Sequence, residues 1–194
     1  GVIGGANTTP QDLRAFLTAI QAALPSQIRG LDKISAQTGT QHGGVVNPDG
    51  SLGRMQLDTD LVEQLSDAAR IEFGLAGLVQ HGASTLQIEQ LAQLKAHGVI
   101  EVHLATGIQN IIFDHPAFPH DLRTRLQTEL LEPETGPETD QKASCDELSP
   151  AQQFYKARWA AWGPFKRELW SLPESAWSEI CVSRDDWFGQ IFQA

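Results

Sequence analysis

The sequence predicts an α/β fold in which parallel strands alternate with helices, followed by a C-terminal helical extension. Short apolar runs suited to buried strands occur three times before residue 105, and each leads into a turn and a helical pattern. Such repetition implies parallel strands with right-handed crossovers, as in a doubly wound sheet or a barrel. Three strands are too few to close a barrel. Beyond residue 119 the pattern turns helical.

The composition excludes several classes of protein. A chain of 194 residues with 41% hydrophobic content can bury a substantial core. The 14 Lys and Arg against 24 Asp and Glu give a net charge of -10, which disfavours binding to nucleic acid or an anionic membrane. No apolar run approaches the roughly 20 residues that span a bilayer, and no export signal is recognisable. Cys145 and Cys181 lie far apart, which fits a reducing compartment, so we expect a cytoplasmic protein.

Hydrophobic spacing and local caps predict the order of the elements. Strands are expected, from their apolar runs, at 30–38, 75–80 and 99–104. Helices are expected, from their apolar periodicity, at 10–24, 59–73, 84–97, 108–113, 121–131 and 151–163. Thr9, Pro10 and Asp12 form the start signal of the first helix, and Gly74 suits the left-handed residue that ends the second.

The later elements follow the same signals. Ser84 and Thr85 are expected to begin the third helix, and Thr106 with Gly107 leads into the fourth. An acidic linker with Pro and Gly is expected at 132–150. All five tryptophans lie in the last segment, where large aromatics more often pack a helical appendage, or dock it on a partner, than bind a cofactor; they are Trp159, Trp162, Trp170, Trp177 and Trp187.

A histidine lies near the carboxyl end of each expected strand: His42, His81 and His103. In parallel α/β folds the loops at these ends converge, and neutral imidazoles from neighbouring strand ends are good zinc ligands. A single histidine in such a place is more often a plain hydrogen-bonded residue. Because His42 and His81 are both followed by glycine, the choice between metal ligand and turn stays open for them. His97, His115 and His120 are assigned no function.

Small residues follow the second histidine. Gly82, Ala83 and Ser84 would let an anion approach the backbone, where amide groups, the Ser84 hydroxyl and a helix N-terminus can hold a phosphate without a lysine. Thr106 and Gly107 repeat the arrangement after the next strand. The alternative is that these residues are only helix caps and tight turns, and for Ser84 alone that alternative is favoured.

Three segments, GTQHGG (39–44), GLVQHGAST (77–85) and GVIEVHLATGIQN (98–110), resemble in order and spacing the C-terminal half of the class II, metal-dependent fructose-bisphosphate and tagatose-bisphosphate aldolases. GVIGG at 1–5 is similar to the glycine-rich segment after the fifth barrel strand of that family, and Pro164-Phe165-Lys166 to the tail of one bacterial branch. The resemblance implies that residues 1–120 are part of a TIM (β/α)₈ barrel, about strands 6 to 8 with their helices. Residues 121–194 would then be a helical extension.

The resemblance also implies a site. A zinc ion held by three histidines, two of them His42 and His81, would polarise the carbonyl of a ketose phosphate and stabilise the enediolate. Phosphate, substrate and a monovalent cation (Na⁺ or K⁺) would be held by Gly43, Gly82, Ala83, Ser84, His103 and Thr106. The family usually has asparagine and aspartate where this chain has His103 and Ala105, which alters the contacts to the dihydroxyacetone part of the substrate.

In that family the third histidine ligand, a proton-transferring aspartate and a catalytic glutamate come from the earlier half of the barrel. We therefore expect the acid/base residues upstream of Gly1 and assign no catalytic residue to this chain. The first hypothesis is the C-terminal part of a class II aldolase that splits a ketose 1,6-bisphosphate into dihydroxyacetone phosphate and an aldehyde. Alone it would bind zinc weakly and be inactive. Its expected partner is a second copy, as in a homodimer, or the missing N-terminal half.

Two alternatives stay open. One is a non-catalytic half-barrel that binds a sugar phosphate, or pairs with a partner chain through its exposed strand edges. The other is a sugar-phosphate isomerase or epimerase on the same barrel, because phosphate loops and histidines at strand ends would also serve enediolate chemistry there.

Overall fold

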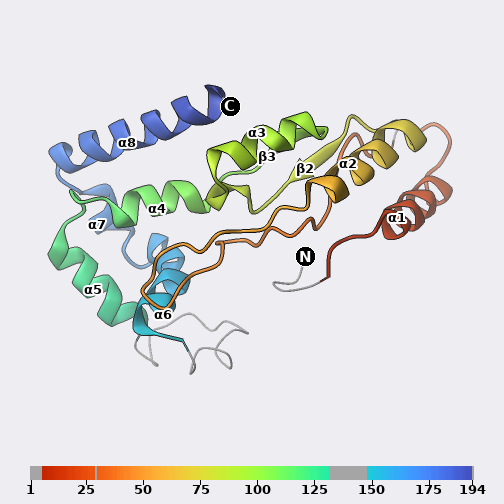
Figure 1. The fold of residues 1–194 in the computed structure, drawn as a ribbon. Coiled ribbons are helices and arrows are strands. Elements are labelled where there is room, and N and C mark those ends of the chain that lie inside the picture. The colour runs from red at the N-terminus through yellow and green to blue at the C-terminus, as the bar shows by residue number, and fades with distance from the viewer. Residues whose placement is uncertain (1–5, 29, 132–147, 194) are drawn as a thin grey trace. The chain divides into compact units, whose positions relative to one another are not determined.

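The computed structural model describes residues 6–28, 30–131 and 148–193. The expectations for residues 1–5, for Cys145 and for most of the linker lie outside these residues. The chain divides into two compact units, drawn in Figure 1. The first comprises Gly1–Gly44, Arg54–Ala105 and Ile191–Ala194, and the second comprises Val45–Gly53 and Thr106–Gln190. The domain boundary expected near residue 120 stays a prediction.

The first unit is a parallel sheet with its helices. Its strands are β1 (Ile34–Ser35), β2 (Leu78–Gln80) and β3 (Val99–Val102), which pair in the order β1-β2-β3, all parallel. Its helical elements are α1 (Pro10–Ala23), α2 (Thr59–Asp67), the π-helical η1 (Ala68–Glu72), the 3₁₀ turn η2 (Ala83–Thr85) and α3 (Ile88–Ala96). Parallel strands that alternate with helices confirm the predicted α/β class.

Helix α1 begins as its sequence predicts, and it packs on the core of this unit. The Thr9 hydroxyl accepts a hydrogen bond from the Asp12 amide at 3.1 Å, and the Asp12 carboxylate accepts one from the Thr9 amide at 3.0 Å. The core cluster contains buried apolar side chains from all of the helices and from β2 and β3, among them Leu13, Leu17, Val62, Leu65, Leu78, Leu94 and Val99. Burial of these side chains is the main force that holds the helices on the sheet.

All three strands and the third helix are shorter than expected. Gly77 has a φ of +151°, and a Cβ there would lie 2.9 Å from Ile100 Cγ2, so only glycine fits. Because of this irregular backbone, the strand expected at 75–80 begins only at Leu78, as β2. The strand expected at 30–38 is reduced to Ile34 and Ser35, the two residues that pair with β2. The third helix begins at Ile88 because Gln87 and Gln90 form a capping box there. The expectation that Ser84 and Thr85 begin this helix is therefore wrong.

Other boundaries are closer to the prediction. The helix expected at 59–73 is present as α2 followed by η1, and Gly74 has the left-handed φ of +68° that was expected. Strand β3 ends two residues before the expected boundary at residue 104. No described helix has the length and the apolar character that a membrane crossing requires.

The second unit is helical. It contains α4 (Thr106–Asp114), α5 (His120–Leu131), α6 (Pro150–Ala157), the 3₁₀ helix η4 (Arg158–Trp162), α7 (Lys166–Trp170) and most of α8 (Glu174–Gln193). Its core cluster includes Phe113, Phe118, Leu126, Phe154, Leu169 and Ile180. Trp162 and Trp177 pack against this cluster, while Trp159 and Trp170 are exposed. At least two of the tryptophans therefore have the packing role that the sequence favours.

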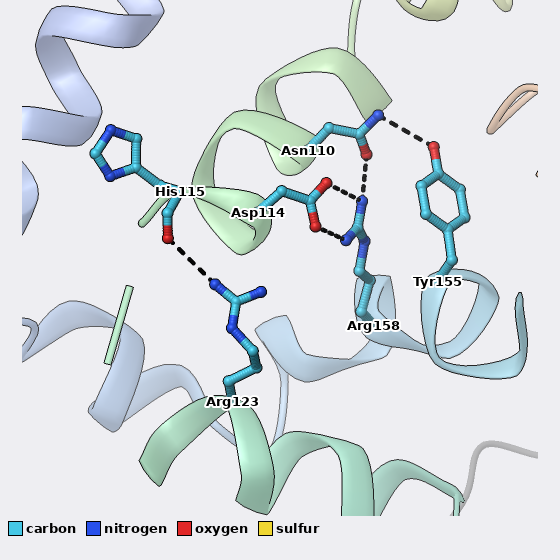
Figure 2. Close-up of polar contacts among 6 residues, drawn as sticks. All are labelled: Asn110, Asp114, His115, Arg123, Tyr155 and Arg158. Carbon is cyan, nitrogen blue, oxygen red and sulfur yellow. Dashed lines mark hydrogen bonds and ion pairs between the residues drawn. The ribbon is translucent and has the colours of Figure 1, made fainter. Parts of the chain in front are cut away.

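A buried arginine joins η4 to α4 within this unit (Figure 2). The Arg158 guanidinium donates to both carboxylate oxygens of Asp114, at 2.5 and 3.1 Å, and to the Asn110 carbonyl oxygen at 2.6 Å. It also lies 4.3 Å from the ring centroid of Tyr155, whose hydroxyl accepts from the Asn110 amide at 3.1 Å. Burial raises the pKa of that Tyr155 hydroxyl. The bidentate geometry and the ring contact hold the guanidinium in one orientation.

The two ends of this ion pair differ in exposure, so their removal should have different costs. The Arg158 side chain is 5% exposed and that of Asp114 is 56% exposed. Asp114→Ala leaves the buried Arg158 guanidinium without its carboxylate partner, so we expect it to lower the free energy of unfolding by about 2–3 kcal/mol. This loss is smaller than that for a fully buried ion pair, because Asp114 is partly solvated. Arg158→Met leaves a carboxylate that water can reach, and should cost roughly 1 kcal/mol. Urea unfolding measures both; a larger loss for Arg158→Met would contradict this account.

Candidate metal and phosphate site

The structure brings the three histidines of the strand ends together. His42 lies in the loop after β1, His81 directly follows β2, and His103 directly follows β3. The ring centroids of His42 and His81 are 5.7 Å apart, and those of His81 and His103 are 4.3 Å apart. The convergence expected for the carboxyl ends of parallel strands is present, whereas the roles of the three imidazoles stay predictions.

Alternation along the strands explains why these rings meet. Val79 and Glu101 are register partners on β2 and β3. In parallel strands, register partners point to the same face of the sheet, and residues two positions later return to that face. His81 and His103 each lie two positions beyond this pair. They therefore leave the sheet on the face opposite Leu78, which is in the core cluster with the helices.

The His42 and His81 rings have a spacing that suits a shared metal ion. Zn–N bonds of about 2.0–2.1 Å in tetrahedral geometry separate imidazole centroids by roughly 5 Å. The 5.7 Å between His42 and His81 is close to this value. The 4.3 Å between His81 and His103, with ring planes at 62°, is instead an edge-on ring contact. Within the described residues no group of three His, Cys, Asp or Glu side chains could hold a metal ion, so this donor set fits zinc in part.

A buried polar network holds the loops that carry these two histidines. The Thr38 hydroxyl donates to the Gln80 carbonyl oxygen at 2.9 Å, and the Gln80 amide nitrogen donates to the Thr40 hydroxyl at 2.7 Å. Both Gln80 and Thr40 also donate to the backbone carbonyl of His81, each at 2.8 Å. Thr38, Thr40 and Gln80 are at most 5% exposed. The network therefore ties the segment before His42 to the end of β2.

Two glycines of the predicted site have left-handed backbones but different surroundings. Gly82 has a φ of +67°, and a Cβ there would lie 3.0 Å from the carbonyl carbon and oxygen of Gln41. Only glycine allows this close approach of the two histidine loops. Gly43 has a φ of +85°, but among the residues that the structure describes a Cβ there would meet nothing within 4 Å. Its surroundings are open enough for a ligand to approach the backbone.

The remaining phosphate-site predictions fall in different surroundings. Ala83 is fully buried, and the Ser84 hydroxyl accepts a hydrogen bond from the Ala105 amide at 3.3 Å. Ser84 lies in the 3₁₀ turn η2, so it lacks the α-helix N-terminus that was expected to help it bind phosphate. Thr106 is the first residue of α4, in the second unit. The helix dipole can therefore support an anion at Thr106 and not at Ser84.

Thr85 was not singled out by the sequence. Its side-chain oxygen is buried and has no hydrogen-bond partner among the residues that the structure describes. A Cβ on Gly44 would lie 2.8 Å from this oxygen, so the hydroxyl rests against the backbone of the GTQHGG loop. A buried hydroxyl is usually satisfied by protein, water or an ion, which makes this oxygen a candidate donor to a ligand.

Glu101 was also missed, although it lies two residues before His103 and so shares its face of the strand. Its carboxylate accepts hydrogen bonds from the Lys33 ammonium and, at 2.6 Å, from His103 Nε2. The bonds from Lys33 and His103 lower the pKa of Glu101. The pKa of His81 is also lowered, first by burial and then by the neighbouring His103 and His42 imidazoles.

The fold and this site define an α/β protein with imidazoles and small-residue turns at the carboxyl edge of a parallel sheet. The chain belongs to the class-II fructose-bisphosphate aldolase family, because the family described as "Fructose-bisphosphate aldolase class-II" matches residues 1–160. This finding confirms the resemblance drawn from the three segments GTQHGG, GLVQHGAST and GVIEVHLATGIQN. None of the curated proteins matches the chain significantly.

Solved structures of fructose-bisphosphate aldolases are similar to the chain. One, described as a fructose-1,6-biphosphate aldolase from Coccidioides immitis, is 19% identical with a TM-score of 0.41, over 89% of this chain and 46% of that one. Another, fructose-bisphosphate aldolase from Campylobacter jejuni, is 20% identical with a TM-score of 0.40, over 80% of this chain and 44% of that one. The chain spans less than half the length of these two proteins.

The Gln80 network gives a first prediction for this site. Gln80→Leu removes the acceptor of the buried Thr38 hydroxyl, and we expect it to lower the free energy of unfolding by about 2–3 kcal/mol, the cost of unsatisfied buried polar groups. Gln64→Leu, at an exposed position of α2, is the matched control and should change it by less than about 0.5 kcal/mol. Urea unfolding compares the two. Equal losses would mean that the network does not hold the loops.

A second prediction concerns pH in metal-free protein. Because the pKa of folded His81 lies below its usual value of about 6.5, the native state binds fewer protons than the unfolded state in the window between them. The His81 contribution to stability is therefore complete above about pH 6.5 and is lost as the pH falls through the lowered pKa. Urea unfolding in a chelator, from about pH 8 to about pH 5, should show a smaller loss for His81→Gln than for the unsubstituted chain. Identical pH profiles would count against this assignment.

Proposed function

We propose that this chain forms the metal-binding and phosphate-binding part of a class II aldolase. The enzyme is a lyase that reversibly cleaves a ketose 1,6-bisphosphate into dihydroxyacetone phosphate and an aldehyde, in the cytoplasm. One observation carries the proposal: within a chain of the class-II fructose-bisphosphate aldolase family, His42 and His81 converge at a spacing that suits one metal ion. Dihydroxyacetone phosphate and its ketose bisphosphate are the proposed ligands.

The fold proposed for the first unit is about strands 6 to 8 of a TIM (β/α)₈ barrel. The strand order supports it, because each strand of a barrel neighbours the next strand in sequence, and β1, β2 and β3 pair in that order. A doubly wound sheet reverses its strand order at a switch point, and no reversal occurs among these three strands. Residues 121–194 are the proposed helical extension.

The metal in this proposal is zinc, and His42 and His81 are two of its ligands. His103 is a substrate contact in this proposal and not the third ligand, because its ring centroid lies only 4.3 Å from that of His81 in an edge-on contact, and no group of three His, Cys, Asp or Glu side chains among the described residues could hold a metal ion. The third ligand and the acid/base groups belong to sequence outside these 194 residues, as part of the same polypeptide or of a partner. When bound, zinc supplies a Lewis acid for the substrate carbonyl. The chain's own residues orient the two imidazoles and hold the ligand.

Phosphate is held in this proposal by backbone amides and small side chains. Gly43, Gly82, Ala83 and Ser84 supply the turns beside the two histidines. Thr106 is the first residue of the nine-residue helix α4 in the second unit, and its role in phosphate binding stays a prediction. A monovalent cation, Na⁺ or K⁺, binds near the same turns. The buried Thr85 oxygen beside Gly44 supports this part of the proposal, because hydroxyl and carbonyl oxygens suit a hard cation.

Zinc binding tests the assignment of the ligands. Isothermal titration calorimetry of the full chain should detect weak binding, which His42→Ala and His81→Ala each weaken by roughly tenfold or more, as loss of a metal-site residue does. His97→Ala is the matched control: its ring is bonded to the Gln93 carbonyl at the end of α3, so zinc binding should not change. Undiminished binding by His81→Ala would exclude it as a ligand.

Activity tests the division of roles. The 194-residue chain alone should cleave neither fructose 1,6-bisphosphate nor tagatose 1,6-bisphosphate, whereas a protein that also contains the earlier half of the barrel should cleave one of them and lose that activity in a chelator. Robust turnover by the chain alone would contradict the proposal. Binding without cleavage by the longer protein would favour the non-catalytic half-barrel, and interconversion of isomers would favour the isomerase or epimerase.

A further inference from the structure

Glu101 is a charged residue within a strand, on the face of the sheet opposite the core cluster. Its carboxylate has two hydrogen-bond donors. One is the ammonium of Lys33, the residue before β1, and the other is Nε2 of His103, the residue after β3. The Glu101 side chain is 35% exposed, and those of Lys33 and His103 are 46% and 49% exposed. The three form a chain of polar contacts across β2 that ends at His103.

The bond from His103 to Glu101 determines which ring nitrogen carries the proton. An ionised carboxylate can only accept hydrogen bonds, so His103 Nε2 must be the donor. In a neutral imidazole the other nitrogen, Nδ1, is then an acceptor. The lowered pKa of Glu101 agrees with an ionised carboxylate. The edge-on contact with His81 fixes the plane of the same ring.

We propose that Glu101 is a positioning residue for His103. It keeps the proton on Nε2 and holds the ring against His81, so that Nδ1 is the atom presented to a ligand. Glutamate at position 101 therefore supports a histidine where the related aldolases usually have asparagine. The chemical consequence is selectivity: an imidazole acceptor favours a ligand that offers a hydroxyl donor over one that offers only anionic or carbonyl oxygens.

The identity of that ligand rests on the proposed function. Dihydroxyacetone phosphate carries one free hydroxyl beside its carbonyl, so it can donate to His103 Nδ1, whereas inorganic sulfate has only acceptor oxygens at neutral pH. We expect Glu101→Ala to weaken binding of dihydroxyacetone phosphate by about fivefold, the effect of one hydrogen bond, and to leave binding of inorganic sulfate unchanged.

The direct test is nuclear magnetic resonance of the imidazole nitrogens in the full chain. A proton on His103 Nε2 that is bonded to a carboxylate should be protected from exchange and give a directly bonded ¹⁵N–¹H signal, identified by its absence in His103→Asn. Glu101→Ala should abolish this signal. Glu101→Gln keeps an acceptor oxygen and should restore it, and Glu63→Ala, which removes an exposed carboxylate from α2, should leave it unchanged.

The outcomes separate the two proposals. A signal that survives in Glu101→Ala, or a proton found on Nδ1 in the unsubstituted chain, would overturn the positioning role. Failure of the unsubstituted chain to bind dihydroxyacetone phosphate, with the signal behaving as expected, would instead count against the proposed function. Loss of the signal together with unchanged urea unfolding in Glu101→Ala would establish positioning apart from stability.

Discussion

The hydrogen bonds of the Gln80 side chain determine how the two predicted metal ligands lie. A buried amide is costly unless its donors and acceptor are used, and this one bonds to Thr38, to Thr40 and to the His81 carbonyl. These partners come from the segment before His42 and from the end of β2. The network therefore aligns two loops that are about 40 residues apart in sequence, and Gly82 allows their backbones to touch.

The two faces of the short sheet have separate tasks. Leu78 faces the core formed with the helices, and this burial supplies the stability of the first unit. The opposite face carries Glu101 and then, past the strand ends, His81 and His103. Alternation puts Leu78 and Val79 of β2 on opposite faces, and the register shift between β2 and β3 lets Val99 lie in the core while Glu101 lies on the other face. The same two strands can therefore hold an apolar core and present polar groups to a ligand. Glu101 and His103 are partly exposed to water on this face, so keeping them polar costs little folding free energy.

Local signals predicted much of this arrangement. Apolar runs predicted the parallel strands, the Thr9 capping box predicted the first helix, and the position of histidines after strands predicted that they would converge. Side-chain contacts between residues distant in sequence could not be predicted from local signals. The Gln80 network and the Arg158–Asp114 ion pair are of this kind, because they join segments 40 or more residues apart. The predicted start of the third helix was too early. Serine is a common N-cap residue, which pointed to Ser84, but the helix begins at the capping box formed by Gln87 and Gln90.

The central claim is that this chain holds one metal ion between His42 and His81. A titration of the full chain with zinc, followed through the ¹⁵N resonances of both imidazoles, tests it most directly. The account predicts that one equivalent of zinc shifts the two sets of resonances together, with the same dependence on zinc concentration, while those of His97 do not move. Resonances of His42 and His81 that shift at different zinc concentrations, or a shift of only one of them, would contradict it.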